Sequence, residues 1–197
     1  MRIRRPVQEG IITNWDDTEA IWFSIFIGHE HLRAAPEEHP ILFTESVASP
    51  PENREKMAQV MFEHFNVPAL AIRTTAELAL FASGRKTGVV VEFGYDVTHV
   101  VPIHSGVVVK EAVQRLDVGG ANLTEYLIKL LMEERAYCLS TTHERRHVEE
   151  AKERLAYVAL DFEEEMQKAT AAGSSREPEF KIQTGGDIDT YKVGNEL

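Results

Sequence analysis

The first part of the chain carries hydrophobic positions in both helical and strand-like patterns. Asn14 is placed as an N-cap, and the acidic residues after it complement the dipole of a first helical turn. An apolar stripe at helical spacing follows, made of Ile21, Trp22, Ile25 and Phe26. Short apolar segments at 41–43 and 69–72 are each typical of a strand. This stretch is therefore predicted to hold one helix and two strands.

Two further helices are predicted around these strands. Ser49-Pro50-Pro51 opens the first, which runs through Phe65. Its apolar residues share one helical face, and they are Met57, Val60, Met61 and Phe65. The second helix spans Thr75 to Ser83, and Gly84 is placed to end it, because glycine readily adopts the left-handed conformation found at helix ends.

The pattern changes to short strands at Gly88. The run Val89-Val90-Val91 is typical of a buried strand, and residues 92–96 form a turn. A return strand follows over 97–103, and the segments 107–109 and 112–118 continue the sheet. The prediction is a meander of hairpins.

The last part of the chain is predicted to be mainly helical. One helix is marked by Leu123, Leu127, Leu130 and Leu131, and Thr142 opens another that runs to about Leu155. The segment from Ala169 to Glu177 is small and polar, so we expect an exposed loop. The segments 180–183 and 185–187, with the tail, predict a weak hairpin.

Composition narrows the function classes. The chain has 197 residues, of which 43% are hydrophobic and 27% charged, as in a soluble globular protein of one domain or two small ones. Its formal charge of −11 argues against binding a nucleic-acid backbone. Cys138 is the only cysteine, so no disulfide within the chain is expected. No apolar run approaches the roughly 18 residues of a membrane span, and we expect a cytoplasmic protein.

One motif suggests metal chemistry. His143-Glu144-Arg145-Arg146-His147 spells H-E-x-x-H on a predicted helix, and its spacing places both histidines on one face, as in zinc metalloproteases. Three features weigh against that reading. The motif lies in the first turn, where the helix dipole disfavours a cation, two arginines lie between the histidines, and no third ligand stands out downstream. The zinc protease therefore remains a remote alternative.

Several stretches are similar to actin and follow actin's order over nearly the whole chain. They are residues 10–17, 35–40, 53–57, 61–63, 82–85, 98–103 and 157–163, with one short insertion near 28–31. Many aligned segments in one order are a stronger signal than a single motif. The chain is therefore identified as a member of the actin superfamily.

The resemblance implies an α/β, actin-like fold, which in that family consists of two domains flanking a nucleotide cleft. It covers a middle portion of an actin chain, so we expect a partial fold with an incomplete first domain. Residues 1–86 would be a remnant of the first domain. Residues 87–118 would be the β-meander of the second domain, with a degenerate phosphate hairpin, and residues 119–197 its helical subdomain.

The resemblance also places a degenerate nucleotide site on the hairpin 92–96. Actins wrap the phosphates of ATP with two such hairpins, whose glycines allow close backbone approach and whose aspartates organise magnesium. Here Gly94 is kept and Glu92 retains a carboxylate. Phe93 and Tyr95 replace a small residue and an aspartate, so we expect the phosphate space to be filled. Asp96 replaces a glycine, which matters if that position has a positive φ.

Other positions of the family's site are altered or ambiguous. Thr75 stands where a glutamine positions the attacking water, and it is too short to do so. His99 matches a histidine near that water, although we favour a strand histidine with a satisfied hydrogen bond. Lys152 and Glu153 match a pair beside the base and ribose, and a solvated helix face explains them equally well. Glu9 replaces a histidine, and its carboxylate would repel a triphosphate.

These substitutions favour a structural protein over an enzyme. The first hypothesis is a divergent actin-like subunit of a cytoskeletal filament or a multi-subunit complex, for which we expect no catalytic residue and no cofactor. The alternative is an ATP-binding actin, with ATP or ADP and Mg²⁺, whose hydrolysis gates polymerisation. In both cases we expect a cytoplasmic, cytoskeletal location. We also expect protein partners such as actin or actin-like subunits, no nucleic acid or membrane, and a chain that does not stand alone.

Overall fold

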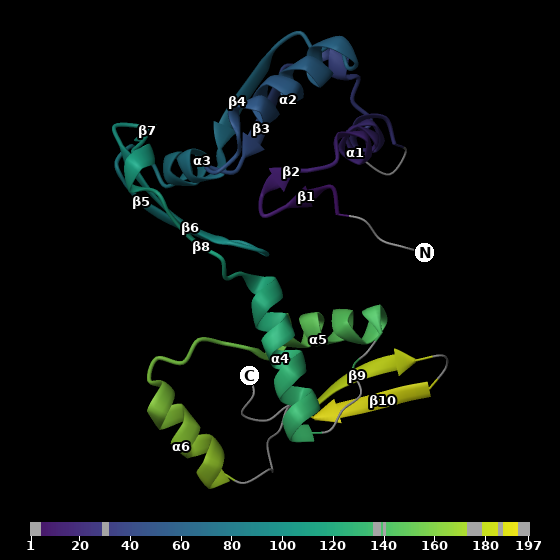
Figure 1. Ribbon diagram of the computed structural model, residues 1–197, viewed down its shortest axis with the longest axis vertical. Helices are drawn as coiled ribbons and strands as arrows, with labels where there is room; N and C mark the ends of the chain where they lie inside the picture. Colours follow the sequence, from purple (N-terminus) through teal and green to yellow (C-terminus); the bar gives the residue numbers. More distant parts are fainter. Residues whose placement is uncertain are drawn as a thin grey trace. The chain divides into compact units, whose positions relative to one another are not determined.

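The computed structural model describes residues 5–28, 32–135, 139, 141–172, 179–184 and 187–192. It divides into two compact units, Met1–Gly120 and Ala121–Leu197 (Figure 1). The finer division expected from the resemblance, at 86/87 and 118/119, stays a prediction. Cys138 lies outside the described residues. Among the described helices, none is both long and apolar enough to cross a membrane.

The first unit begins with a small hairpin that the sequence pattern did not predict. Strands β1 (Val7–Gln8) and β2 (Ile11–Ile12) pair antiparallel. The two residues between them both have positive φ, 52° for Glu9 and 77° for Gly10. Positive φ at both central residues is the geometry of a tight two-residue turn, which suits glycine and strains Glu9.

Helix α1 (Trp15–Ile27) starts where the sequence predicted. The side-chain oxygen of Asn14 accepts a hydrogen bond of 3.0 Å from the backbone N–H of Asp17, as an N-cap should. A short 3₁₀ turn, η1 (Pro36–Glu38), then leads into strand β3 (Ile41–Glu45).

Helix α2 (Pro51–Glu63) and strand β4 (Leu70–Thr74) complete the first layer. Strands β3 and β4 pair in parallel, with Ile41 opposite Leu70. The helical face predicted for α2 is confirmed for Met57, Val60 and Met61, which are buried. Phe65 is buried too, but the helix was predicted to run through it and ends at Glu63. A core cluster forms there from Val60, Met61, Phe65 and Val67, against which Trp22, Phe26, Ile41, Phe43 and Leu70 pack.

Helix α3 (Thr75–Ala82) links this layer to a second sheet. Its N-terminus is fixed by a capping box, in which Thr74 and Glu77 exchange side-chain and backbone hydrogen bonds. Gly84 follows with a φ of 75°, as expected of a glycine that ends a helix. A second core cluster joins α3 to the sheet through Ala76, Leu80, Val101 and Ile103.

The predicted meander is confirmed. Strands β5 (Gly88–Phe93), β6 (Thr98–His104) and β7 (Val107–Val108) lie in that order, and β8 (Gln114–Leu116) also pairs with β6 after the 3₁₀ turn η2 (Lys110–Ala112). The strand predicted over Val89-Val90-Val91 is confirmed, but its predicted burial is wrong for two of the three valines. Val90 packs on the second core cluster, whereas Val89 and Val91 are 62% and 47% exposed, because α3 contributes to only one face of the sheet.

The second unit contains helices α4 (Gly120–Arg135), α5 (Thr142–Leu155) and α6 (Phe162–Ala172), followed by the antiparallel hairpin of β9 (Glu179–Thr184) and β10 (Asp187–Lys192). The predicted hairpin is confirmed, although residues 185 and 186 lie outside the described part. The loop predicted from Ala169 is wrong at its start, because α6 continues to Ala172; three of the four residues from 169 to 172 are alanine, the best helix former.

Candidate nucleotide cleft

A cavity of about 820 Å³ lies in the first unit, and four of the predicted site residues line it. Glu92, Gly94, Asp96 and His99 come from the β5–β6 hairpin, and Thr75 joins them from the start of α3. The rest of the lining includes Arg5, Gly10, Thr18, Trp22, Glu45 and Tyr95. The hairpin, the β1–β2 turn, α1, the end of β3 and the start of α3 therefore border one space.

Gly94 is required by the turn itself. Its backbone N–H donates a 2.9 Å hydrogen bond to the carbonyl of Val97, and its own carbonyl accepts one of 3.0 Å from Gly120. A Cβ at this position would lie 2.7 Å from the Val97 oxygen. The glycine thus allows close backbone approach, but the amide that a phosphate would need is already bonded within the hairpin.

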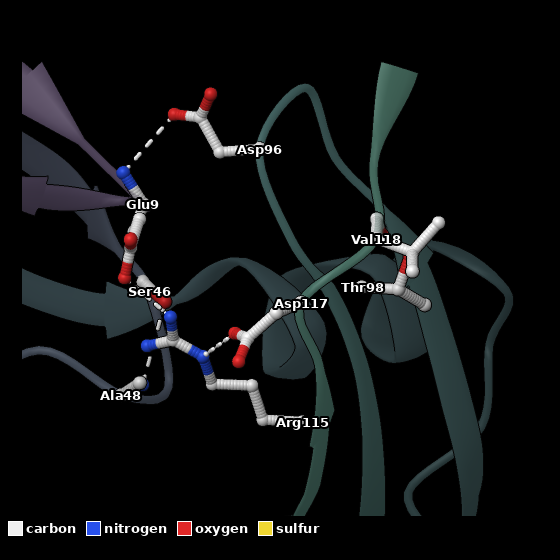
Figure 2. A network of polar contacts seen from close by, with 8 residues as sticks. All are labelled: Glu9, Ser46, Ala48, Asp96, Thr98, Arg115, Asp117 and Val118. Atoms are coloured by element: carbon white, nitrogen blue, oxygen red, sulfur yellow. Dashed lines mark hydrogen bonds and ion pairs between the residues drawn. The ribbon is translucent and has the colours of Figure 1, made fainter. Parts of the chain in front are cut away.

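Asp96 connects the two turns. Its Oδ2 atom accepts a 3.0 Å hydrogen bond from the backbone N–H of Glu9 (Figure 2). Asp96 is not among the residues with positive φ, so its replacement of a family glycine creates no backbone strain. The carboxylate therefore takes up a backbone donor that faces the hairpin.

Arg115 on β8 binds the carboxylates beside this link. It pairs with the carboxylate of Glu9, and its Nε lies 2.7 Å from Oδ1 of Asp117 (Figure 2). The pKa of Arg115 is raised above its usual value. The main cause is the hydrogen bond that its guanidinium donates to Glu9, and the next is the one that it donates to Asp117. Arg115 was not predicted from the sequence as a residue of this site. Strand register could have indicated it, since Arg115 stands opposite His99 on β6.

Tyr95 is held from the other side by Arg5. Nη2 of Arg5 donates a 2.8 Å hydrogen bond to the Tyr95 hydroxyl, and its guanidinium carbon lies 4.4 Å from the ring centroid. Phe93, in contrast, is 83% exposed. Both side chains line the cavity, so the expectation that they fill the phosphate space stays a prediction.

His99 does not have the satisfied hydrogen bond that was expected. Its side chain is 5% exposed, and its Nε2 atom is buried without a hydrogen-bond partner among the described residues. Oε2 of Glu45 is also buried without a hydrogen-bond partner among the described residues. The other oxygen of that carboxylate accepts a hydrogen bond from Arg54. This hydrogen bond to Glu45 raises the pKa of Arg54. Buried polar atoms without partners are rare, so these two are the chemically unsatisfied points of the cleft.

Lys152 and Glu153 belong to the second unit, on α5. Nζ of Lys152 donates a 2.8 Å hydrogen bond to Oγ1 of Thr124 on α4. This contact gives Lys152 a structural part within its own unit, between two helices.

The H-E-x-x-H motif forms the first turns of α5. Glu144 is the third residue of the helix, and its carboxylate accepts a 2.8 Å hydrogen bond from the backbone N–H of Thr141, whose hydroxyl in turn accepts from the Glu144 backbone. The carboxylate that a protease would use as a base is thus part of a capping box. Among the residues that the structure describes, no set of three metal-ligating side chains comes together, whereas a catalytic zinc site needs three.

Comparison with protein families agrees with this architecture. A model of the actin family, described as Actin, matches residues 1–195. The chain belongs to the actin family. The α/β, actin-like fold expected from the resemblance is confirmed.

Proposed function

We propose that this chain is a divergent actin-like structural protein that acts in the assembly of a cytoskeletal filament or a multi-subunit complex, and not as an ATPase. The observation that carries the proposal is the set of contacts across the cleft. The Gly94 amide is bonded to Val97, the Glu9 amide to Asp96, and the Glu9 carboxylate to Arg115. Backbone donors and a cation that could bind phosphate are therefore occupied by the protein.

Electrostatics supports the same conclusion. Carboxylates of Glu45, Glu92 and Asp96 line the cavity, and Glu9 lies beside it. The negative charges of these carboxylates repel the phosphates of a nucleotide, so a triphosphate is disfavoured unless a metal ion or free cations compensate. Arg115, the cation that pairs with Glu9, is shared between two carboxylates, and Arg5, which lines the cavity, is bonded to the Tyr95 hydroxyl.

The open face of the β5–β8 sheet supports a role in assembly. Cross-strand register places Val89, Val91 and Phe93 of β5 on one face with Leu116 of β8, and these four side chains are 47–83% exposed. Several exposed apolar side chains on one face of a sheet are typical of protein interfaces. We propose that this face binds actin or actin-like subunits. Membership of the actin family supports a cytoplasmic, cytoskeletal location, and the proposal requires no cofactor for assembly.

Light scattering after size-exclusion chromatography tests this role. We expect assemblies larger than the 22.2 kDa chain without added nucleotide. Val91→Lys, which places a charge on the open face, should shift the distribution toward smaller species. Phe62→Lys is the matched control, because Phe62 on α2 is exposed to nearly the same extent, 48% against 47%. A 22.2 kDa monomer in both the parent and the variants would contradict the proposal.

A second candidate function is a nucleotide switch, and His99 is the observation that favours it. Its buried, unpartnered Nε2 lines the cavity, and an oxygen of a bound phosphate or its water would satisfy it. Thermal unfolding with Mg-ATP separates the candidates, because a ligand at about 100 times its Kd adds about 2.7 kcal/mol of stability. The structural proposal expects no shift. A shift of several degrees that His99→Phe abolishes and the exposed-site control His104→Phe retains would establish the switch.

A further inference from the structure

The two histidines of α5 present their ring nitrogens to each other. Nε2 of His143 and Nε2 of His147 are 3.3 Å apart, with ring centroids at 4.4 Å and ring planes at 79°. A distance of 3.3 Å is long for a hydrogen bond between nitrogens. It is, however, the separation of two ligands on one ion: zinc–nitrogen bonds of about 2.0–2.1 Å at a tetrahedral angle place the two nitrogens about 3.3–3.4 Å apart.

We propose that His143 and His147 form a two-histidine site for a late first-row divalent cation, with Zn²⁺ as the representative ion and water in its remaining positions. Imidazole nitrogen is a preferred ligand of zinc, copper and nickel, whereas magnesium and calcium prefer oxygen. The site differs from a protease centre, since Glu144 is part of the capping box and the described residues supply no third ligand.

The helix holds the backbone of both histidines in place before any metal binds. His143 lies in a turn fixed by the capping box of Thr141 and Glu144. Val148, which follows His147 in the sequence, is fully buried. Arg145, between the two histidines, pairs with Glu125 of α4. The histidines therefore stand on a rigid element, so that binding a cation requires little reorganisation.

A carboxylate stands behind one of the two rings. An oxygen of Glu150 lies 3.6 Å from Nδ1 of His147, the ring nitrogen that does not face His143. At 3.6 Å the two groups form no hydrogen bond, but negative charge on this side favours the tautomer with its proton on Nδ1, which leaves the Nε2 lone pair for a metal. The His147 side chain is 24% exposed and His143 is exposed, so an ion can reach both.

Charge around the pair is balanced. Helix α5 carries four acidic residues (Glu144, Glu149, Glu150 and Glu153) and four basic ones (Arg145, Arg146, Lys152 and Arg154). The positive end of the helix dipole opposes a cation near His143. Affinity must therefore come from the two nitrogen–metal bonds, and removing either histidine should abolish most of it.

Isothermal titration of the full chain with ZnCl₂, NiCl₂ and MgCl₂ tests the site. We expect one Zn²⁺ or Ni²⁺ per chain and no response to Mg²⁺. His143→Ala and His147→Ala should each weaken Zn²⁺ binding by at least about tenfold, since even loss of an outer-sphere partner reduces metal affinity by about 10–100-fold. His104→Ala, which removes an exposed histidine of the first unit, is the control and should leave binding unchanged.

Imidazole ¹⁵N NMR supplies a readout that does not depend on how the variants fold. Zn²⁺ should move the Nε2 resonances of both His143 and His147 in the parent chain and leave that of His104 in place. Three results would overturn the proposal: no Zn²⁺ binding by the parent, equal affinity in the variant that lacks both histidines, or equally strong competition by Mg²⁺.

Discussion

The core beneath α1 and α2 allows one sharp prediction of stability. Met61 is 0% exposed and lies in the cluster of Val60, Phe65 and Val67. Met61→Ala removes a side chain that is closed in on all sides, and such a change costs about 2–5 kcal/mol, because lost transfer energy adds to the cavity left behind. A domain of this kind is stable by about 5–15 kcal/mol in total. The substitution should therefore remove a large share of the stability of the first unit.

Urea unfolding followed by tryptophan fluorescence measures this loss in the right place. Both tryptophans of the chain lie in α1, and the Trp22 ring packs on Phe43 of β3 with centroids 4.9 Å apart. With a denaturant slope of about 1–3 kcal/mol per molar urea, a loss of about 3 kcal/mol lowers the midpoint by about 1–3 M.

The next residue along the helix is the control. Phe62 is 48% exposed, so Phe62→Ala should change the stability by only about 0.5 kcal/mol. A Met61→Ala variant whose midpoint matches that of the parent would refute the reasoning. So would a Phe62→Ala variant that loses as much stability as Met61→Ala, since burial would then not decide the outcome.

Three further predictions follow from single residues. Thr75→Gln should give no measurable phosphate release above the parent in a continuous phosphate assay, because groups that act as a unit are strongly non-additive; a substantial gain would mean that the remaining site is intact. Gly94→Ala should cost about 1–3 kcal/mol in urea unfolding, since its Cβ meets the Val97 carbonyl at 2.7 Å, whereas Gly88→Ala meets only a movable leucine side chain and should cost less. Asn14→Ala should cost about 1 kcal/mol by tryptophan fluorescence, and a change below about 0.3 kcal/mol would contradict its role as an N-cap.

Elements with chemical signals at their ends could be predicted from the sequence. Asn14 begins α1 and the prolines at 50 and 51 begin α2, because caps and N-terminal prolines act locally. The small turn at Glu9 and Gly10 was not predicted. The turn needs a positive φ at both residues, which glycine at position 10 favours and glutamate at position 9 does not.

Burial was harder to predict than secondary structure. A run of three valines is equally apolar whether one or both faces of its strand are covered, so Val89 and Val91 could not be distinguished from Val90. Which face is covered depends on where α3 packs, and that is a tertiary contact.

The cleft shows how residue identity and residue contacts can lead to different conclusions. Gly94, Asp96 and His99 could be placed by resemblance, and they do line one cavity. Whether that cavity binds phosphate depends on donors that no sequence pattern reveals. A phosphate at the hairpin would have to displace the Glu9 amide from the Asp96 carboxylate, and hydrogen bonds to charged groups are worth about 1.5–3 kcal/mol, toward the lower end at an exposed position such as this one. It would also have to draw Arg115 away from two carboxylates, one of which belongs to Glu9 itself. Restoring one family residue leaves these contacts in place, so the loss of function we propose lies in the whole set of contacts and cannot be reversed at a single position.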